Sequence, residues 1–491
     1  MTIPDFSNYN DALIVNVDWR SVVRTSRTQL TTHLWNAPLV RPGSPIHDQV
    51  FAALRNLKAD HARFLPFWTH PRLSVPQLER PTEQRTHWNF ELLDPGVDDF
   101  MAAAEGRPVV ANFATIPAWM FATDEPVPYS DDPDEANWAY EQGRDLHDPS
   151  TAEVADYFER IASWYIAGGF TDELGVRHES GHDYRFAYWE VLCEPDVGHE
   201  LSPEVYTRLY DEVVKRLRRL DPEMKFIGLS LAMVDLDPEY LWHFLDPDNH
   251  ADGAAPDAFS YHFYACPDVI DPMDSKENPP YEEWRGAIFS QVEAFLDKVK
   301  LIESIKQRLS PHTKTFINEI GTFAPDVMNP EPEIPDEYWA IGSAMIGYLW
   351  SRLTELGIDL VGVAEFVGYP GVIPGVSLLD WETGQPNARY WVTKLLLDNF
   401  GPGDSLVSTE SSALAPDSVL HARGFVTEAG QRKLLLVNKF PRELTIELGS
   451  GETGIMSYVD TSTGSEPPTS IRFETTVRLG PYATAVLTME G

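Results

Sequence analysis

The chain has 491 residues, of which 43% are hydrophobic, and its formal net charge is −38. The length exceeds one ordinary domain, and the apolar content is that of a globular protein with a large core. The acidic residues are spread along the chain, and their charge would repel the phosphates of nucleic acids and anionic membranes. We therefore expect neither nucleic acid nor membrane as a partner, and a neutral substrate fits the charge better than a polyanion.

The start of the chain and its cysteines are typical of a cytoplasmic protein. The opening residues, MTIPDFSNYNDALIV, contain neither the basic nor the apolar region of a secretory signal. No run of about 18 apolar residues occurs, so no membrane span is expected. Cys193 and Cys266 do not imply a disulfide framework. The expected location is cytoplasmic, and the oligomeric state stays open.

Short β-rich apolar runs alternate with amphipathic helical segments over the first 400 residues. The runs are 12–18, 62–68, 107–114, 185–192, 225–232, 257–265, 314–321 and 359–368. The helical segments include 47–61, 202–222 and 287–309, and the second has Ser202 as a predicted N-cap followed by Pro203. Eight such units predict a (β/α)8 TIM barrel. A doubly wound open sheet is the alternative, but no glycine-rich phosphate turn follows any run.

The pattern changes after residue 400. Short alternating runs follow one another with Gly, Pro and Ser turns between them and no helical segment, at 418–428, 432–440, 442–448, 454–460, 470–479 and 482–489. This pattern is typical of an all-β sandwich. We therefore predict a barrel domain over 1–400 and a C-terminal sandwich domain over 401–491, with residues 1–11 as a further candidate part of the sandwich.

Two acidic, proline-rich inserts follow the third and the seventh run, at 122–150 and 324–337. In a barrel both would lie on the C-terminal rim, where active-site loops are found. They are either walls of a substrate pocket or solvent-exposed loops with no role in binding.

Two glutamates occupy strand ends where a barrel enzyme places its chemistry. Glu194 ends the fourth run and Glu319 ends the seventh, so the two carboxylates would face each other across the barrel mouth. Glycoside hydrolysis requires such a pair. Glu190 lies four residues before Glu194, on the same side of an ideal strand. A structural role near the site, paired with an internal cation such as Arg63, is favoured for it over direct chemistry.

Other residues near the predicted strand ends have two interpretations each. Trp119 and Trp381 follow the third and eighth runs, as sugar platforms or as ordinary core residues. Asn318 precedes Glu319 and either binds substrate or turns the strand. His178 and His182 lack an acidic third ligand at metal spacing. No metal and no cofactor are therefore expected.

The fourth run ends in Glu190-Val191-Leu192-Cys193-Glu194-Pro195, which resembles the Glu-Val-Trp-Asn-Glu-Pro motif of glycoside hydrolase family 39. The segments FINEIG, with Glu319, and FSYHFYA, with His262 and Tyr264, resemble the seventh and sixth strands of that family. Over about residues 12 to 400 the chain is similar to clan A glycoside hydrolases, most of all to this family of β-xylosidases and α-L-iduronidases.

The resemblance implies a carbohydrate substrate and a retaining, exo-type glycosidase acting on a neutral glycoside. Glu194 would be the general acid/base, Glu319 the nucleophile, and His262 and Tyr264 would orient the nucleophile or contact sugar hydroxyls. Arabinofuranosidase, arabinopyranosidase or β-glucuronidase specificity are alternatives. A non-catalytic carbohydrate-binding relative is the alternative from another class.

Cys193 departs from the family motif, which has Asn at this position. That Asn usually donates a hydrogen bond to the sugar 2-hydroxyl, and a thiol is a much weaker donor. We expect Cys193 to border the substrate, with the 2-position handled differently or differing in configuration. A nucleophilic role for Cys193 is disfavoured because the neighbouring Glu194 would raise the pKa of the thiol.

Overall fold

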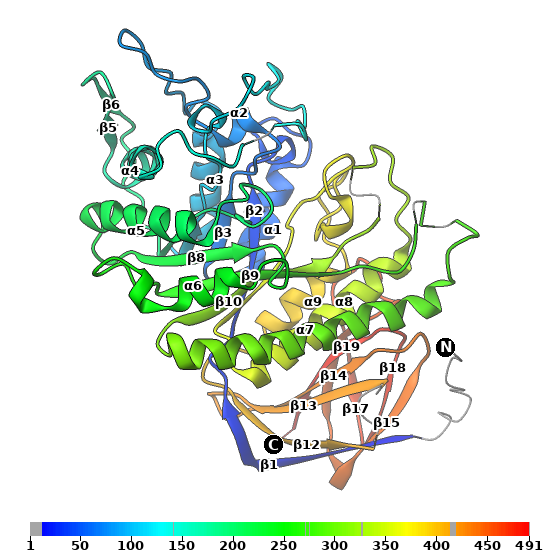
Figure 1. Cartoon of the computed structure of the whole chain (residues 1–491). Coiled ribbons are helices and arrows are strands. Elements are labelled where there is room, and N and C mark those ends of the chain that lie inside the picture. Colours follow the sequence, from blue (N-terminus) through cyan, green and yellow to red (C-terminus); the bar gives the residue numbers. More distant parts are fainter. Residues whose placement is uncertain are drawn as a thin grey trace.

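The computed structural model describes residues 12–140, 142–270, 272–273, 275–325, 328–412 and 419–490. A closed barrel surrounded by helices lies beside a β-rich domain (Figure 1). The predicted (β/α)8 barrel with a C-terminal β-sandwich is therefore confirmed.

Eight parallel strands close the barrel, and the last, β11, pairs with the first, β2. They are β2 Gln29–Trp35, β3 Ala62–Leu65, β4 Val109–Ala111, β7 Tyr188–Glu190, β8 Lys225–Leu231, β9 Ala258–Ala265, β10 Lys314–Thr322 and β11 Leu360–Val363. Seven of the eight predicted runs contain one of these strands. Near-continuous burial along them is what a sheet covered on both faces requires.

Helices cover the outside of the barrel (Figure 1). They are α1 His47–Leu57, α2 Pro71–Ser74, α3 Asp94–Ala104, α4 Ala152–Ile166, α5 Pro203–Leu220, α6 Glu239–Leu245, α7 Tyr281–Leu309, α8 Asp336–Leu356 and α9 Ala388–Leu397. Helix α5 begins as predicted, because the Ser202 hydroxyl accepts a hydrogen bond from the Val205 amide. The described loops of the barrel contain four short 3-10 turns and one hairpin. The turns are η2 Pro38–Val40, η3 Ala118–Met120, η4 Pro247–Asn249 and η5 Pro374–Val376, and the hairpin consists of β5 Gly169–Thr171 and β6 Arg177–Glu179.

The prediction that run 12–18 is the first barrel strand is wrong. It belongs to β1 Leu13–Thr25, which pairs antiparallel with β12 Ser405–Ser411 and parallel with β15 Leu444–Leu448 in the sandwich. Burial alternates along its first residues, with Leu13 and Val15 inside and Ile14 exposed. Such alternation is typical of a strand with one wet face rather than of a barrel strand covered on both faces.

The true first barrel strand, β2, is hard to recognise because it is polar. Thr31, Thr32 and His33 are all buried within it. The Thr32 hydroxyl donates to the Val363 carbonyl at 2.8 Å, so this buried polar group is paired inside the sheet.

The β-rich domain is one nine-stranded sheet in the order β17-β16-β19-β14-β13-β12-β1-β15-β18. Its remaining strands are β13 Leu420–Val426, β14 Arg432–Asn438, β16 Gly454–Val459, β17 Thr469–Phe473, β18 Thr476–Leu479 and β19 Thr484–Met489, and η6 Gly449–Gly451 is a 3-10 turn. The sheet encloses its own apolar core, including Leu436 and Leu487. Residues 1–11, the predicted further part of this domain, lie outside the described residues.

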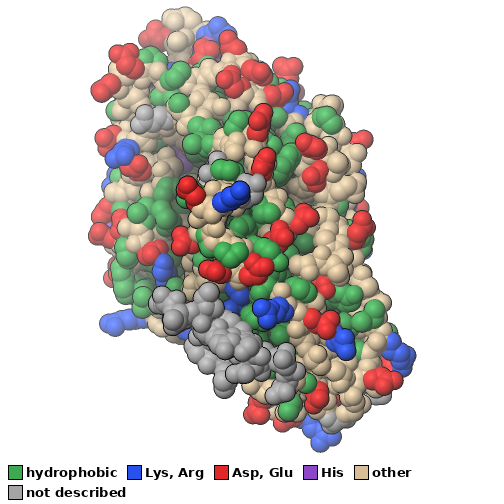
Figure 2. Space-filling model, turned by 90° about the vertical axis from the view of Figure 1, so that its right-hand side faces the viewer, with side chains coloured by type: hydrophobic (Ala, Val, Ile, Leu, Met, Phe, Trp, Pro, Cys, Tyr) green, Lys and Arg blue, Asp and Glu red, His purple; other side chains and the backbone are tan. Residues whose placement is uncertain are grey.

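The two domains meet along α8, whose Trp350 contacts Phe425 of β13 at 6.0 Å between ring centres. Among the described residues, no helix combines the length and the apolar character needed to cross a membrane. On the face seen in Figure 2, acidic side chains are scattered among hydrophobic ones, as expected from the dispersed charge along the sequence.

Candidate active site

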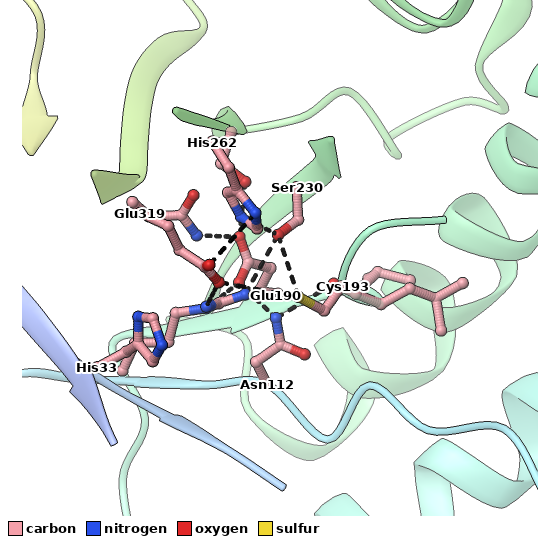
Figure 3. Close-up of polar contacts among 12 residues, drawn as sticks. His33, Asn112, Glu190, Cys193, Ser230, His262 and Glu319 are labelled. Carbon is pink, nitrogen blue, oxygen red and sulfur yellow. Dashed lines mark hydrogen bonds and ion pairs between the residues drawn. The ribbon is translucent and has the colours of Figure 1, made fainter. Parts of the chain in front are cut away.

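Arg63 of β3 lies at the centre of a polar cluster in the barrel, which Figure 3 shows in close-up. Its Nε donates to Glu190 Oε2 at 2.5 Å and its Nη1 to Glu319 Oε1 at 2.6 Å. Its Nη2 contacts Cys193 Sγ at 3.3 Å and Ser230 Oγ at 3.2 Å. The guanidinium therefore joins the ends of three strands, and the contact with Glu190 expected from the sequence is present.

Glu190 is wholly buried and its carboxylate is saturated with donors. Besides Arg63 and the Asn112 amide, the Ser260 hydroxyl donates to it at 2.6 Å and the Asn318 amide at 2.8 Å. A carboxylate so enclosed holds the strands together rather than reaching a substrate. Asn318, predicted to bind substrate, instead has its side chain inside the barrel as a support for Glu190.

The turn that carries Glu194 is strained. Leu192 and Glu194 have φ angles of 65° and 51°, a left-handed conformation that costs a residue other than glycine about 1 kcal/mol or more. The Glu194 amide donates to the Ser230 carbonyl at 2.8 Å, and its own carbonyl accepts from the Gly198 amide at 2.8 Å. This turn leaves the Glu194 side chain 28% exposed and within reach of solvent.

Glu319 is buried in β10, next to a register shift against β9. Its Oε2 accepts a hydrogen bond from the Tyr264 hydroxyl at 2.6 Å, and its Oε1 accepts from Arg63. Burial alone would raise the pKa of Glu319, but the charges of His262, His33 and Arg63 outweigh it and hold the pKa well below its ordinary value. Glu319 is therefore ionised, as a carboxylate nucleophile must be.

His262 of β9 bridges the two glutamates. Its Nδ1 lies 2.8 Å from Glu194 Oε1 and 3.4 Å from Glu319 Oε2, and its Nε2 contacts Ser230 Oγ at 3.0 Å. Burial by itself would lower the pKa of His262. The negative charge of Glu319 and the hydrogen bond to Glu194 raise the pKa by more than burial lowers it, so the net shift is upward. Because one nitrogen contacts both carboxylates, the two contacted oxygens lie at most about 6 Å apart, which is below the ~6.5–9.5 Å between the carboxyl groups of inverting glycosidases.

The Cys193 thiol lies among these charged groups. Burial raises the pKa of Cys193 well above its ordinary value, and the neighbouring Arg63 only partly opposes this. A neutral thiol is a poor nucleophile.

Ligand atoms of Cys193, His262 and Glu319 lie within 4.8 Å of one another, as a metal site requires. The Arg63 guanidinium contacts two of the three, however, and its charge opposes a cation there.

The sequence interpretation missed two buried residues beside the site, His33 and Glu365. They form an ion pair at the end of β2 and just beyond β11. Burial raises the pKa of Glu365, and the charge of His33 partly offsets the rise. Glu365 lies inside the predicted run 359–368, whereas Glu194 and Glu319 were predicted from their places at the ends of runs. His33 gave no signal because its strand was not recognised.

Neither predicted tryptophan platform contacts the cluster in the part of the chain that the structure describes. The Trp119 indole donates to the Gln77 carbonyl at 2.9 Å, and its ring packs against the barrel core. Trp381 lies half-buried in a turn whose Gly384 abuts Gln49 of α1. His178 and His182 contact different acids, Asp172 and Asp98, and so share no ligand site.

Comparisons with known proteins agree with this architecture. A family model described as the D-apionate lactonase C-terminal immunoglobulin-like domain matches residues 418–487. Among curated proteins, no sequence matches significantly. Similar solved structures include the thermostable GH51 α-L-arabinofuranosidase from Thermotoga petrophila RKU-1, which is 15% identical with a TM-score of 0.64 over 98% of this chain and 100% of that one.

Two further solved structures share the fold. The catalytic domain of GH30 xylanase C from Talaromyces cellulolyticus is 11% identical, with a TM-score of 0.57 over 97% of this chain and 100% of that one. A glucosidase from Croceicoccus marinus is 14% identical, with a TM-score of 0.60 over 98% and 100%. Identities this low indicate a common fold and not a common substrate. The chain has the fold of clan A glycoside hydrolases, and the comparisons do not support family 39 in particular.

Proposed function

We propose that the chain is a retaining, exo-type glycoside hydrolase that acts on a neutral glycoside, with Glu194 as acid/base and Glu319 as nucleophile. The observation that supports the proposal is the His262 bridge, which keeps one oxygen of each carboxylate within about 6 Å of the other, as a double displacement needs two nearby carboxylates. Their environments differ as the two roles require: Glu319 is buried and kept ionised, and Glu194 is partly exposed.

In the first step, a Glu319 oxygen attacks the anomeric carbon and forms a glycosyl ester, while the glycosidic C–O bond breaks. Glu194 gives its proton to the departing oxygen. In the second step, the Glu194 carboxylate takes a proton from water, the water oxygen attacks the anomeric carbon, and the ester bond to Glu319 breaks. Arg63 and Tyr264 hold the Glu319 carboxylate in one orientation throughout.

The charges around the site favour a neutral sugar over a uronic acid. Arg63 is already paired with Glu190 and Glu319, and His262 lies between Glu194 and Glu319. A substrate carboxylate would meet like charges without a free cationic partner among these residues. Arabinosidase specificity stays open within this proposal, and β-glucuronidase specificity is disfavoured.

A second candidate activity is hydrolysis of a sugar lactone, favoured by the match of residues 418–487 to the C-terminal domain of D-apionate lactonases. In that reaction Glu194 would take a proton from water while the water oxygen adds to the lactone carbonyl. The ring C–O bond would then break, and Glu194 would give the proton to the leaving ring oxygen, so that a hydroxy acid forms. The match covers the sandwich and not the site, so we rank this activity second.

The test is a screen of the full chain against aryl glycosides of pentoses, hexoses and uronic acids, together with aldonolactones. We expect turnover of a neutral glycoside, a first product that keeps its anomeric configuration by NMR, and losses of about 10²–10⁴-fold in Glu194→Gln and Glu319→Gln. Glu382→Gln, on the exposed turn after β11, is the control. Wild-type activity in both site variants would refute the proposal. Turnover of lactones alone would favour the second candidate, and no turnover at all would favour the non-catalytic relative.

A further inference from the structure

A further buried carboxylate, Glu365, lies beside the candidate active site and takes no part in the double displacement. It follows β11 and is 1% exposed. Its Oε1 accepts a hydrogen bond from the Phe366 amide at 2.8 Å, and its Oε2 pairs with His33 Nε2. Its own amide donates to the Val376 carbonyl at 2.9 Å, so the backbone that carries it is fixed as well. Burying a carboxylate is unfavourable unless it is paired, so its role has to be sought in its partner, His33.

His33 lies near the end of β2, next to Arg63 on β3. The two residues are register partners in this parallel pair of strands, so their side chains leave the sheet on the same face. The His33 side chain is 3% exposed. Among the residues that the structure describes, no polar atom pairs with its Nδ1, so the contact with Glu365 is the polar contact that fixes the ring.

His33, Glu319 and Glu365 act on one another electrostatically. In Figure 3, His33 and Glu319 lie on the same flank of the cluster, away from Cys193. Against the rise that burial causes, the charge of His33 is among those that lower the pKa of Glu319. Burial raises the pKa of Glu365, the charge of His33 opposes the rise, and the charge of Glu319 adds to it. Each of the two carboxylates is therefore stabilised in its ionised form by the same imidazole.

The buried charges of the cluster balance only when His33 is included. Arg63 is paired with Glu190 and Glu319, and it makes no ion pair with Glu365 among the described contacts. Without His33, an ionised Glu365 would be an uncompensated negative charge near Glu319 and would oppose its ionisation. A protonated His33 and an ionised Glu365 together carry no net charge. Glu365 can thus stabilise the imidazolium without adding net negative charge to the site.

We propose that His33 and Glu365 are positioning residues for the proposed nucleophile: Glu365 fixes the His33 ring and stabilises its protonated form, and His33 holds a positive charge beside Glu319. Both act through Glu319 and not on the substrate. The inference rests on the proposed function for the role of Glu319 as nucleophile. The electrostatic coupling between His33 and Glu319 does not depend on that role, so the two can be tested separately.

Other charged and titratable groups of the cluster act on Glu319 as well, and all of them stay in place when His33 or Glu365 is replaced. They are Arg63 of β3, Glu190 of β7, Cys193 and Glu194 of the turn after β7, and His262 and Tyr264 of β9. A change in the ionisation of Glu319 in those variants is therefore due to the pair.

The first experiment is a double-mutant cycle in the free energy of unfolding, measured by urea titration of the full chain at pH 7. His33→Gln removes the imidazole charge. We expect it to lose more stability with Glu319 present than in the Glu319→Gln background, because the charge it removes stabilises an ionised Glu319. Equal losses in the two backgrounds would overturn the coupling. His250→Gln is the matched control, because the His250 side chain is 3% exposed and pairs with Asp211 of α5 at 2.7 Å; its loss should be the same in both backgrounds.

The second experiment measures kcat/KM against pH for an aryl glycoside that wild type hydrolyses. The acid limb of this profile reports ionisation of the nucleophile in the free enzyme. His33→Gln should move the limb to higher pH, by about one unit, because a neighbouring positive charge favours the ionised carboxyl. Glu365→Gln should move it in the same direction, because the buried His33 then lacks the partner that stabilises its proton. A direct effect of the Glu365 charge on Glu319 has the opposite sign, since removing a neighbouring negative charge lowers a carboxyl pKa.

The double variant His33→Gln/Glu365→Gln separates the two effects further. It should move the limb no further upward than His33→Gln does, because Glu365 acts through His33. An unmoved limb in His33→Gln, or a limb moved to lower pH by Glu365→Gln, would overturn the proposal. A merely structural pair would lower stability, as His250→Gln does, and leave the limb in place.

If His33→Gln does not fold, the direction of the shift in Glu365→Gln decides. If wild type hydrolyses no glycoside, the proposed function and the nucleophile role fail, and the mutant cycle alone decides whether His33 and Glu319 are coupled.

Discussion

Replacing Arg63 by Met removes a cation that contacts both Glu190 and Glu319. Arg63 is 2% exposed, and the two side chains it pairs with are 0% and 7% exposed. Loss of one partner from a buried ion pair costs about 3–5 kcal/mol, because the remaining charge is left uncompensated. With two carboxylates left behind, we expect Arg63→Met to lower the free energy of unfolding at pH 7 by at least that amount.

The assay is urea unfolding followed by tryptophan fluorescence. The signal reports mainly on the barrel, because only Trp19 of the fourteen tryptophans lies on the sandwich sheet. The double variant Arg63→Met/Glu190→Gln removes one of the two stranded charges and should recover part of the loss. If Arg63→Met lowers the free energy of unfolding by less than about 1 kcal/mol, the reasoning is refuted, because a loss that small is what a solvent-exposed ion pair would give.

The loss should also depend on pH. The pKa of Glu319 in the folded wild type lies below its ordinary value, partly through Arg63. That shift stabilises the fold above the ordinary carboxyl pKa, and the stabilisation disappears as the pH falls towards the folded pKa. The gap between wild type and Arg63→Met should therefore be widest near neutral pH and narrow in acid. A gap that stays constant over this range would contradict the electrostatic account.

Three further changes test single contacts in the site. Glu194→Gln should slow glycosides with poor leaving groups far more than those with good ones, because only the former need protonation; equal losses in a leaving-group series of kcat/KM would contradict the acid role. Tyr264→Phe removes a 2.6 Å hydrogen bond to the ionised Glu319, worth about 1.5–3 kcal/mol, so kcat should fall roughly 10- to 100-fold, and an unchanged kcat would count against it. The raised pKa of His262 stabilises the fold below its ordinary pKa, and this is lost as the pH rises through the folded value. His262→Gln should therefore flatten the fall in unfolding free energy as the pH rises above the ordinary imidazole pKa of about 6.5, measured by urea titration, and a fall as steep as that of wild type would speak against the bridge.

The barrel could be predicted because most of its strands are apolar throughout, as parallel strands must be when both faces are covered. The exception was β2, whose buried Thr31, Thr32 and His33 gave a polar sequence. Thr32 bonds to the Val363 carbonyl of β11 and His33 pairs with Glu365 just beyond it, both more than 300 residues away, so no local pattern reveals these partners. The apolar run at 12–18 took its place because alternating and continuous apolar patterns differ little over so few residues.

The glutamates of the site could be predicted from their strand ends, and their environment could not. Sequence position brought Glu194 and Glu319 to the same rim, but the sharing of His262 between them depends on the register shift in β10. The inward direction of Asn318 follows from the same shift.

The position of β1 between β12 and β15 has a consequence for how the polypeptide matures on the ribosome. The segment Leu13–Thr25 is synthesised before the barrel, but its two neighbours in the sheet exist only after the whole barrel has been synthesised. A fragment beginning at residue 401 would lack this central strand and expose two unsatisfied sheet edges, which favour aggregation. The two domains are consecutive on a linear map, yet topologically the barrel is inserted into the sandwich.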